Sequence, residues 1–255
     1  RKFEIPILVE DNNDIEIDEL LKSVNDNWER STDTGSVNEF GETGRVLSEG
    51  RTSNNAWCRQ DCENNVHVQN INRKISEITQ VPVENFEAFQ VLRYQIGQKY
   101  SVHHDASPVQ SKQASGARIL TFFLYLSDVE EGGETAFPTL NVAVKPKKGS
   151  AILWPSCLDS DPYKIDSRTM HEAKPVVRGV KFAANTWIHS HNFAKSNLWG
   201  CTGTVSTNAR NHCVEDKISI SIYLTTRFLF ILFYSIFYFS STFLTTRTLT
   251  VVAFN

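Results

Sequence analysis

The chain has 255 residues, of which 40% are hydrophobic and 22% charged, and its formal net charge is −3. This composition excludes a mainly disordered, collagenous or coiled-coil protein and predicts one large globular domain with additional segments. Acidic and basic residues are evenly mixed, so we expect no nucleic-acid partner. The chain begins at Arg1 without a methionine, which predicts a processed or truncated N-terminus.

The N-terminal part carries mainly helical patterns. Residues Phe3 to Val9 fit a short strand. Asp14 to Trp28 predicts an amphipathic helix, because apolar residues recur at helical spacing after an acidic first turn. Val66 to Thr79 predicts a second amphipathic helix, which Pro82 terminates.

From Phe89 onward, short segments rich in β-branched and aromatic residues replace the helical period. Glycine-containing turns such as Glu131-Gly132-Gly133 separate them. The predicted strands are Phe89–Tyr94, Ile119–Leu126, Val142–Val144, Ala151–Trp154 and Val180–Ile188. Helices followed by many short strands predict an α+β fold in which N-terminal helices pack on an antiparallel β-sandwich or jelly roll.

One short motif, His103-His104-Asp105, indicates a candidate metal-binding site. Side chains at i and i+2 of a strand project to the same face, so His103 and Asp105 can grip one cation while His104 points away as a spacer. His171 lies near the start of a later strand-like segment and offers a second imidazole. Two histidines and one carboxylate form the facial triad of non-haem Fe(II) oxygenases.

Lys181 follows His171 on a predicted core strand. A 2-oxoacid that chelates iron needs a cation for its far carboxylate, and this lysine would supply one. Taken singly, His103 and His171 are more often ordinary surface or core histidines. The conjunction of H-x-D, a distal histidine and a lysine on a β-rich background is the stronger signal.

Residues from about Phe3 to Phe193 resemble the prolyl 4-hydroxylases, which are Fe(II)- and 2-oxoglutarate-dependent dioxygenases. The similarity is carried by blocks that occur in the family's order and spacing. They are Arg51-Thr52-Ser53, the segment Val91 to Asp105, Arg118 to Leu126, Glu131 to Pro138, Lys147 to Ala151, and His171 to Lys181.

The resemblance implies a double-stranded β-helix (jelly-roll or cupin-like) core with N-terminal packing helices. It also implies a role for individual residues. His103, Asp105 and His171 would ligate Fe(II), and Lys181 would pair with the 5-carboxylate of 2-oxoglutarate, helped by Thr135 and Tyr94. Tyr100, Arg118 and Trp187 would line the groove for the peptide substrate. The simpler alternatives are core aromatic residues at Tyr94, Tyr100 and Trp187 and a strand-edge charge at Arg118.

The implied reaction is hydroxylation of peptidyl proline at C4, coupled to decarboxylation of 2-oxoglutarate to succinate and CO2. The implied cofactors and cosubstrates are Fe(II), 2-oxoglutarate, O2 and ascorbate, and the implied partner is a proline-containing peptide or protein. Two alternatives remain open: hydroxylation of a lysyl residue or small molecule, and a catalytically silent peptide-binding relative. Ala106-Ser107-Pro108 departs from the aromatic residues usual after H-x-D, which bears on substrate preference.

The cysteines give two expectations. Cys58 and Cys62 should be bridged, or lie one helical turn apart as free thiols, and Cys157 should be a buried small hydrophobe. Cys201 and Cys213 are a second nearby pair. Local disulfides would indicate the endoplasmic reticulum or secretory pathway, although no N-x-S/T sequon adds support.

The composition changes after Asn192, so we divide the chain into a catalytic domain (1–194), a polar linker (195–217) and a hydrophobic tail (218–255). Between Arg227 and Arg247 the tail has no charged residue, and this stretch is close to the roughly 20 residues that span a bilayer. Three interpretations are open for it: a membrane anchor, an unselected extension, or an extra strand or helix packed on the domain.

Overall fold

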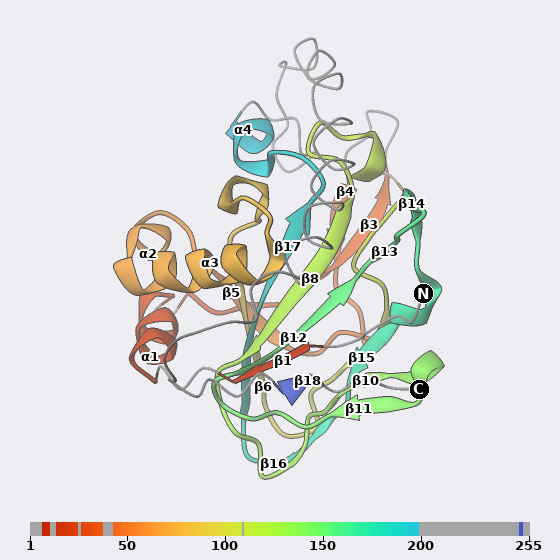
Figure 1. Cartoon of the computed structure of the whole chain (residues 1–255). Helices are drawn as coiled ribbons and strands as arrows, with labels where there is room; N and C mark the ends of the chain where they lie inside the picture. Colours follow the sequence, from red (N-terminus) through yellow and green to blue (C-terminus); the bar gives the residue numbers. More distant parts are fainter. Residues whose placement is uncertain are drawn as a thin grey trace, which may run out of the picture.

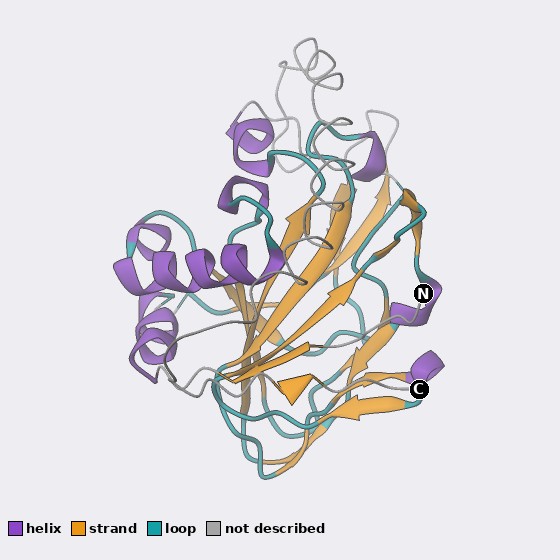
Figure 2. Ribbon diagram, viewed as in Figure 1, coloured by secondary structure: helices purple, strands orange, loops and turns teal. Residues whose placement is uncertain are grey.

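The computed structural model describes residues 7–10, 14–24, 27–37, 43–108, 110–198 and 250–251. It is a mixed α/β structure in which antiparallel sheets are accompanied by helices (Figures 1 and 2). The predicted combination of N-terminal helices and antiparallel strands is therefore present.

The largest sheet has eight strands, and each strand pairs antiparallel with its neighbours. In spatial order the strands are β18 (Thr250–Val251), β1 (Ile7–Glu10), β12 (Ser150–Pro155), β8 (Arg118–Tyr125), β17 (Lys181–His189), β6 (Gln90–Tyr94), β5 (Asn54–Trp57) and β2 (Glu29–Arg30).

A second sheet of four strands lies against part of the first (Figure 1). Its order is β11 (Val142–Val144), β10 (Thr135–Phe137), β15 (His171–Ala173) and β7 (Tyr100–His103). Three two-stranded ribbons complete the described strands: β13 (Cys157–Leu158) with β14 (Asp161–Ile165), β16 (Val176–Arg178) with β9 (Glu131–Gly132), and β3 (Asp33–Val37) with β4 (Thr43–Val46).

The helices gather mainly on one face of the eight-stranded sheet (Figures 1 and 2). The α-helices are α1 (Asp14–Ser23), α2 (Asp61–Asn64), α3 (Val66–Thr79) and α4 (Phe193–Leu198). The 3-10 helices are η1 (Val83–Asn85), η2 (Gln110–Lys112), η3 (Pro138–Leu140) and η4 (Ser167–Thr169).

Both predicted N-terminal helices form, but one is shorter than expected. Helix α3 has the predicted bounds: the Asn65 side chain caps its start by accepting the His67 N–H at 2.9 Å, and Gln80 ends it with φ 57°. Helix α1 ends at Ser23 instead of Trp28. The run Asn25-Asp26-Asn27 has low helix propensity, and Trp28 instead packs its ring 6.0 Å from that of Phe182.

The predicted strands after Phe89 are confirmed as β6, β8, β11, β12 and β17, with ends that differ by at most one residue. The predicted first strand is also present as Ile7–Glu10, and residues 3–6 of the predicted range lie outside the described residues. The Glu131-Gly132-Gly133 turn adopts positive φ at both glycines, 76° and 72°. At Gly132 a Cβ would collide with the carbonyl oxygen of Pro175, so a side chain cannot fit there.

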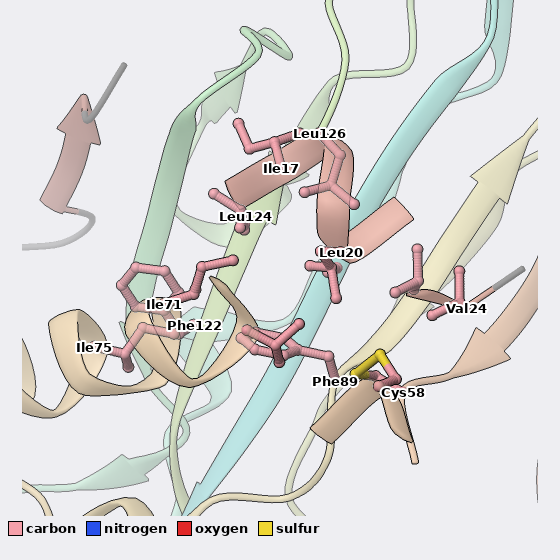
Figure 3. Packing of buried hydrophobic residues seen from close by; sticks show 14 of the residues in the cluster. Ile17, Leu20, Val24, Cys58, Ile71, Ile75, Phe89, Phe122, Leu124 and Leu126 are labelled. Atoms are coloured by element: carbon pink, nitrogen blue, oxygen red, sulfur yellow. A yellow bond between two sulfur atoms is a disulfide. The ribbon is translucent and has the colours of Figure 1, made fainter. Parts of the chain in front are cut away.

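A hydrophobic cluster joins the helices to the eight-stranded sheet (Figure 3). Its members alternate along β8, where Phe122 and Leu124 face helices α1 and α3. The labelled residues of the cluster are Ile17, Leu20, Val24, Cys58, Ile71, Ile75, Phe89, Phe122, Leu124 and Leu126.

A second cluster lies on the opposite face and joins the two sheets. From the eight-stranded sheet it takes Phe123, Tyr125 and Trp154, and from the smaller sheet Phe137 and Ala173. Successive residues of β8 from Phe122 to Tyr125 thus belong alternately to the two clusters. This second face is the one that carries the candidate site.

Cys58 and Cys62 form a disulfide, with a Cα–Cα distance of 5.1 Å, which confirms the expected bridge. Both residues belong to the helix-side cluster, and Figure 3 shows the sulfur–sulfur bond at Cys58 within it. Cys157 is free and buried, as predicted, and burial raises its pKa to about 11. Cys201 and Cys213 lie outside the described residues.

The predicted boundary after residue 194 falls inside α4, where Ser196 is buried and its hydroxyl donates to the Asn192 carbonyl at 2.7 Å. The rest of the predicted linker lies outside the described residues, as does the tail up to residue 249. Of the tail, Thr250–Val251 pairs with β1 at the sheet edge. Among the described helices, none is long and apolar enough to cross a membrane.

Candidate metal centre and the groove around it

Two histidines and an aspartate meet where the smaller sheet approaches the larger one. His103 ends β7 and His171 begins β15, and these residues are direct partners in the antiparallel register. Asp105 follows two residues after His103. The potential ligand atoms of the three residues all lie within 4.8 Å of one another. The His171 Nε2 to Asp105 Oδ2 distance is 3.6 Å, and the His103 Nε2 to Asp105 Oδ1 distance is 4.0 Å.

One detail of the sequence argument is wrong. Asp105 does not share a strand face with His103, because β7 ends at His103. The loop after the strand turns the carboxylate back toward the imidazoles, and the Thr121 hydroxyl of β8 donates to Asp105 Oδ2 at 2.7 Å. A residue of the large sheet therefore fixes the carboxylate.

The hydrogen bonds of the two imidazoles set their tautomers. His103 Nδ1 lies 2.9 Å from the Ser101 carbonyl oxygen, and His171 Nδ1 lies 2.9 Å from that of Thr169. A carbonyl oxygen only accepts, so each Nδ1 carries the proton and donates. The lone pair is left on each Nε2, which is the atom that faces Asp105. Metal-binding histidines are commonly oriented by such a backbone contact.

The charges of the cluster also suit a cation. Burial would raise the pKa of Asp105, but the neighbouring His171 and His103 and the Thr121 hydroxyl lower it to about 2. Burial and the proximity of His171 lower the pKa of His103 to about 3. At neutral pH the pair is therefore a carboxylate and an uncharged imidazole, the protonation states that a metal ligand needs.

His104 does not join the cluster, as expected, although β7 ends before it and no strand face separates it from His103. Its Nδ1 accepts the Ala106 N–H at 3.0 Å, which places the proton on Nε2. That Nε2 donates to the Asp166 carbonyl at 3.1 Å and lies 3.2 Å from the Thr169 hydroxyl. His104 thus connects the loop of Asp105 to the segment directly before His171.

A buried lysine lies deeper between the sheets. Lys181 is fully buried (0% exposed), and its ammonium donates to the Gly133 carbonyl at 2.8 Å and approaches the Thr135 hydroxyl at 3.5 Å. Within the described part of the chain no carboxylate forms an ion pair with it. The rings of Tyr94 and Phe123 each lie 5.3 Å from Nζ. Burial lowers the pKa of Lys181 to about 7.

Thr135 and Tyr94 both lie beside this lysine, as the sequence comparison predicts. The phenol of Tyr94 is buried, which raises its pKa. Sequence reasoning missed Tyr125, whose hydroxyl donates to Thr135 Oγ1 at 2.8 Å. The Tyr125 phenol fixes the threonine hydroxyl next to the ammonium, and burial also raises the pKa of Tyr125.

Tyr100, Arg118 and Trp187 line one groove together with the triad, and its cavity volume is about 1230 Å³. The Tyr100 ring stacks on His103 with 3.6 Å between ring centroids. The Arg118 guanidinium lies 3.7 Å from the centroid of the Trp187 ring. The groove extends inward to Tyr94, Phe123 and Thr135, so one cavity connects the triad with the residues in front of Lys181.

Two further residues of this groove are absent from the sequence prediction. Glu87 accepts from Arg118 Nε at 2.6 Å and interacts with His189 Nε2 at 2.8 Å. Burial would raise the pKa of Glu87, but Arg118 and His189 lower it to about 2. This buried group holds the Arg118 guanidinium against Trp187.

Strand alternation could have revealed some of the missed residues. Lys181 and Trp187 are separated by an even number of positions on β17, so Asn185 and His189 share their face. Thr121 is likewise an alternate neighbour of Phe123 on β8. Glu87 lies before β6 and carries no such signal, because only the fold brings it to Arg118.

Comparison with known proteins agrees with this site. Residues 89–189, which contain the triad and Lys181, match the family model of the 2OG-Fe(II) oxygenase superfamily. The chain is 36% identical over 168 residues to probable prolyl 4-hydroxylase 9 of Arabidopsis thaliana, covering 60% of this chain and 58% of that protein. It is 33% identical over 228 residues to probable prolyl 4-hydroxylase 7 of the same plant, covering 81% of this chain and 66% of the relative.

A solved structure is also similar. The viral collagen prolyl hydroxylase of Paramecium bursaria Chlorella virus-1, in complex with 2OG, superposes with a TM-score of 0.53 at 28% identity, covering 73% of this chain and 96% of that one. The chain spans less than two thirds of the length of the first curated relatives that it matches. From the matched family model and these relatives, residues 89–189 belong to the 2OG-Fe(II) oxygenase superfamily, and the chain is a homologue of the prolyl 4-hydroxylases.

Proposed function

We propose that this protein is an oxidoreductase that hydroxylates peptidyl proline at C4 and couples this to decarboxylation of 2-oxoglutarate to succinate and CO2. One observation carries the proposal: two oriented imidazoles and a carboxylate line a cavity that extends inward to the residues in front of a buried lysine, and this lysine has no ion-pair partner among the described residues. The named prolyl 4-hydroxylase relatives support proline as the target.

The donor set fits Fe(II). His103 and His171 offer Nε2 lone pairs and Asp105 an ionised oxygen, and this 2-His-1-carboxylate set leaves coordination positions open. When bound, Fe(II) with 2-oxoglutarate supplies the O2-dependent oxidation of an unactivated C–H bond. The protein's own part is to orient the ligands and the substrate and to keep the reacting centre away from side reactions.

Lys181 would hold the 5-carboxylate of 2-oxoglutarate, with the Thr135 hydroxyl as a second donor and the Tyr94 phenol lining the same end. Apart from the Gly133 carbonyl and the Thr135 hydroxyl, aromatic rings surround the Lys181 ammonium, so its buried charge is costly until an anion binds. This arrangement favours a ligand with a carboxylate at the end remote from the metal.

The peptide would enter beside Tyr100, Arg118 and Trp187, which lie next to the triad. Proline stacks well on aromatic surfaces and has no N–H to satisfy, so Trp187 and Tyr100 suit a proline ring. Arg118, held by Glu87 and bonded to the Asp105 carbonyl at 3.2 Å, would position the peptide backbone relative to the metal.

We also assign the two facing sheets to the double-stranded β-helix that the family implies, and residues 1–194 to the catalytic domain. The Cys58–Cys62 disulfide supports an oxidising compartment, and we infer the endoplasmic reticulum or secretory pathway. Ascorbate as a rescuing reductant is inferred from the resemblance. For the tail (218–255), composition alone would allow a membrane anchor, but the pairing of Thr250–Val251 with β1 favours the interpretation as an extra strand packed on the domain.

The test is succinate formation by the metal-loaded protein, measured with and without proline-rich peptides and followed by mass spectrometry of the peptide. We expect peptide-dependent succinate release and a gain of one oxygen on proline. Turnover without peptide dependence, or oxygen on lysine, would favour another hydroxylation target. Peptide binding by a protein that binds no iron would favour a silent binding module.

A further inference from the structure

Asn185 is a buried amide that faces the groove without a partner for its donor. It lies on β17, is 4% exposed and lines the cavity that contains the triad. Its Nδ2 is buried and has no hydrogen-bond partner among the described residues. Buried donors are nearly always paired, so an unpaired one inside a binding cavity indicates a missing acceptor.

The pairing of β17 with β8 shows where this donor lies. Trp187 is opposite Thr121, which donates to Asp105 Oδ2 at 2.7 Å, so this pair marks the metal end of the groove. Ala183 is opposite Tyr125, whose hydroxyl binds Thr135 in front of Lys181. This pair marks the lysine end.

Asn185 is opposite Phe123, in the pair between those two. Residues two apart on a strand share a face and are about 7 Å apart along it. Asn185 therefore lies midway between the strand pair at the metal end and the strand pair at the lysine end. A ligand that reaches from one end to the other must pass the wall on which Asn185 lies.

We propose that the Asn185 carboxamide donates a hydrogen bond to an oxygen of 2-oxoglutarate at its metal-chelating end, the 1-carboxylate and keto group. This inference rests on the proposed function and adds a second anchoring point to it. Lys181 holds the far carboxylate, and Asn185 orients the near end at the metal. An anionic acceptor suits this site, because hydrogen bonds to charged oxygens are the strong ones.

The experiment measures 2-oxoglutarate binding by calorimetry, on the protein loaded with Zn(II) and on the metal-free protein, so no turnover is needed. In the Zn(II) form, Asn185→Ala should raise the Kd for 2-oxoglutarate about tenfold or more, the effect of losing one hydrogen bond to a charged group. In the metal-free form the near end is not held at the triad, so the same substitution should change Kd less than twofold. Lys181→Ala should weaken binding in both forms.

Two further variants separate ligand binding from folding. Asn185→Leu has a similar volume and removes the unpaired donor, so its unliganded form should melt at the same temperature as wild type or higher while its Zn(II)-dependent affinity falls. Asn72 of α3 carries another buried amide atom without a described partner but lies outside the groove. Asn72→Ala should leave the Kd for 2-oxoglutarate unchanged.

The outcomes are distinct. An unchanged Kd in Zn(II)-loaded Asn185→Ala, or an equal loss with and without metal, overturns the role of Asn185 while leaving the proposed function intact. Failure of the wild-type Zn(II) form to bind 2-oxoglutarate overturns both.

Discussion

The two faces of the eight-stranded sheet use the same strands for different purposes. Toward the helices, β17 presents Ala184 and Ile188, which are fully buried in an apolar cluster. Toward the groove it presents Lys181 and Asn185, which are also buried. The Lys181 ammonium bonds to a backbone carbonyl but has no ion-pair partner among the described residues, and the Asn185 Nδ2 has no hydrogen-bond partner there. The helix face is therefore filled by apolar packing, whereas the groove face keeps a charge and a donor that a ligand can satisfy.

Because of this difference, mutations on the two faces should affect the stability of the fold and ligand binding separately. A substitution on the helix face should lower the free energy of unfolding and leave ligand affinities of the folded protein intact. A substitution on the groove face should weaken ligand binding and leave the free energy of unfolding nearly unchanged. The following predictions test that separation.

The largest effect is expected at the triad. His103→Ala, Asp105→Ala or His171→Ala should each abolish detectable turnover and strongly weaken Fe(II) binding, because each removes one of three protein ligands. Metal titration and succinate assays measure both effects, and circular dichroism checks that the fold is kept. Activity retained in His171→Ala would contradict the assignment of the metal site.

On the opposite face, Phe122→Ala should cost about 3–5 kcal/mol of unfolding free energy, because a buried phenyl ring leaves a cavity between the sheet and the helices. Urea denaturation measures the loss. The Kd for 2-oxoglutarate of the folded fraction should stay within twofold of wild type. A large change in that Kd would show that the two faces are coupled.

The third prediction concerns pH and the charge of Lys181. Its pKa in the free protein is lowered to about 7 by burial, so the ammonium that a dicarboxylate needs is lost as the pH rises above 7. Affinity for 2-oxoglutarate should be constant below about pH 7 and fall by up to about tenfold per pH unit above it. Calorimetry between pH 6 and 9 measures this.

Lys181→Arg is the control, because a guanidinium stays charged throughout this range and should give a flat profile. Stability of the unliganded protein should change in the opposite direction. The unfolded lysine keeps its proton up to its ordinary pKa of 10.5, so the fold gains stability as the pH rises from about 7 toward that value. A Kd independent of pH in the wild type would contradict the lowered pKa of Lys181, and an unchanged Kd in Lys181→Ala would exclude its proposed role.

The same division into two faces explains what could be predicted from the sequence. Apolar periodicity is a local signal, so helix α3 and the long strands β8 and β17 are found close to their true bounds. The triad and Lys181 are found because an H-x-D pair, a distal histidine and a lysine on a predicted core strand are a rare combination. They also occur in the order and spacing typical of the prolyl 4-hydroxylases. Short strands such as β10 and β16 are absent from the predicted strands because three residues give little periodicity, whereas the equally short β11 is found from its valine content.

Contacts between residues that are distant in sequence could not be predicted either. Glu87 reaches Arg118 and His189 only because β6, β8 and β17 are neighbours in the sheet. The turn that brings Asp105 back to the imidazoles follows from Thr121 on another strand. Such partners are distant in sequence, and no pattern of a single segment contains them.

The smallest expected effect is at His104, which supports the triad without belonging to it. Its imidazole connects the Asp105 loop, through the Ala106 N–H, with the Asp166 carbonyl in the segment that leads into His171. His104→Ala should weaken Fe(II) affinity by about 10-fold, the lower end of the range for residues that orient ligands, and leave turnover at saturating metal measurable. His104→Gln keeps an acceptor and a donor and should recover part of the affinity. Metal titration of both variants beside His103→Ala is the measurement. If His104→Ala proved as damaging as His103→Ala, the division between ligand and support would be wrong.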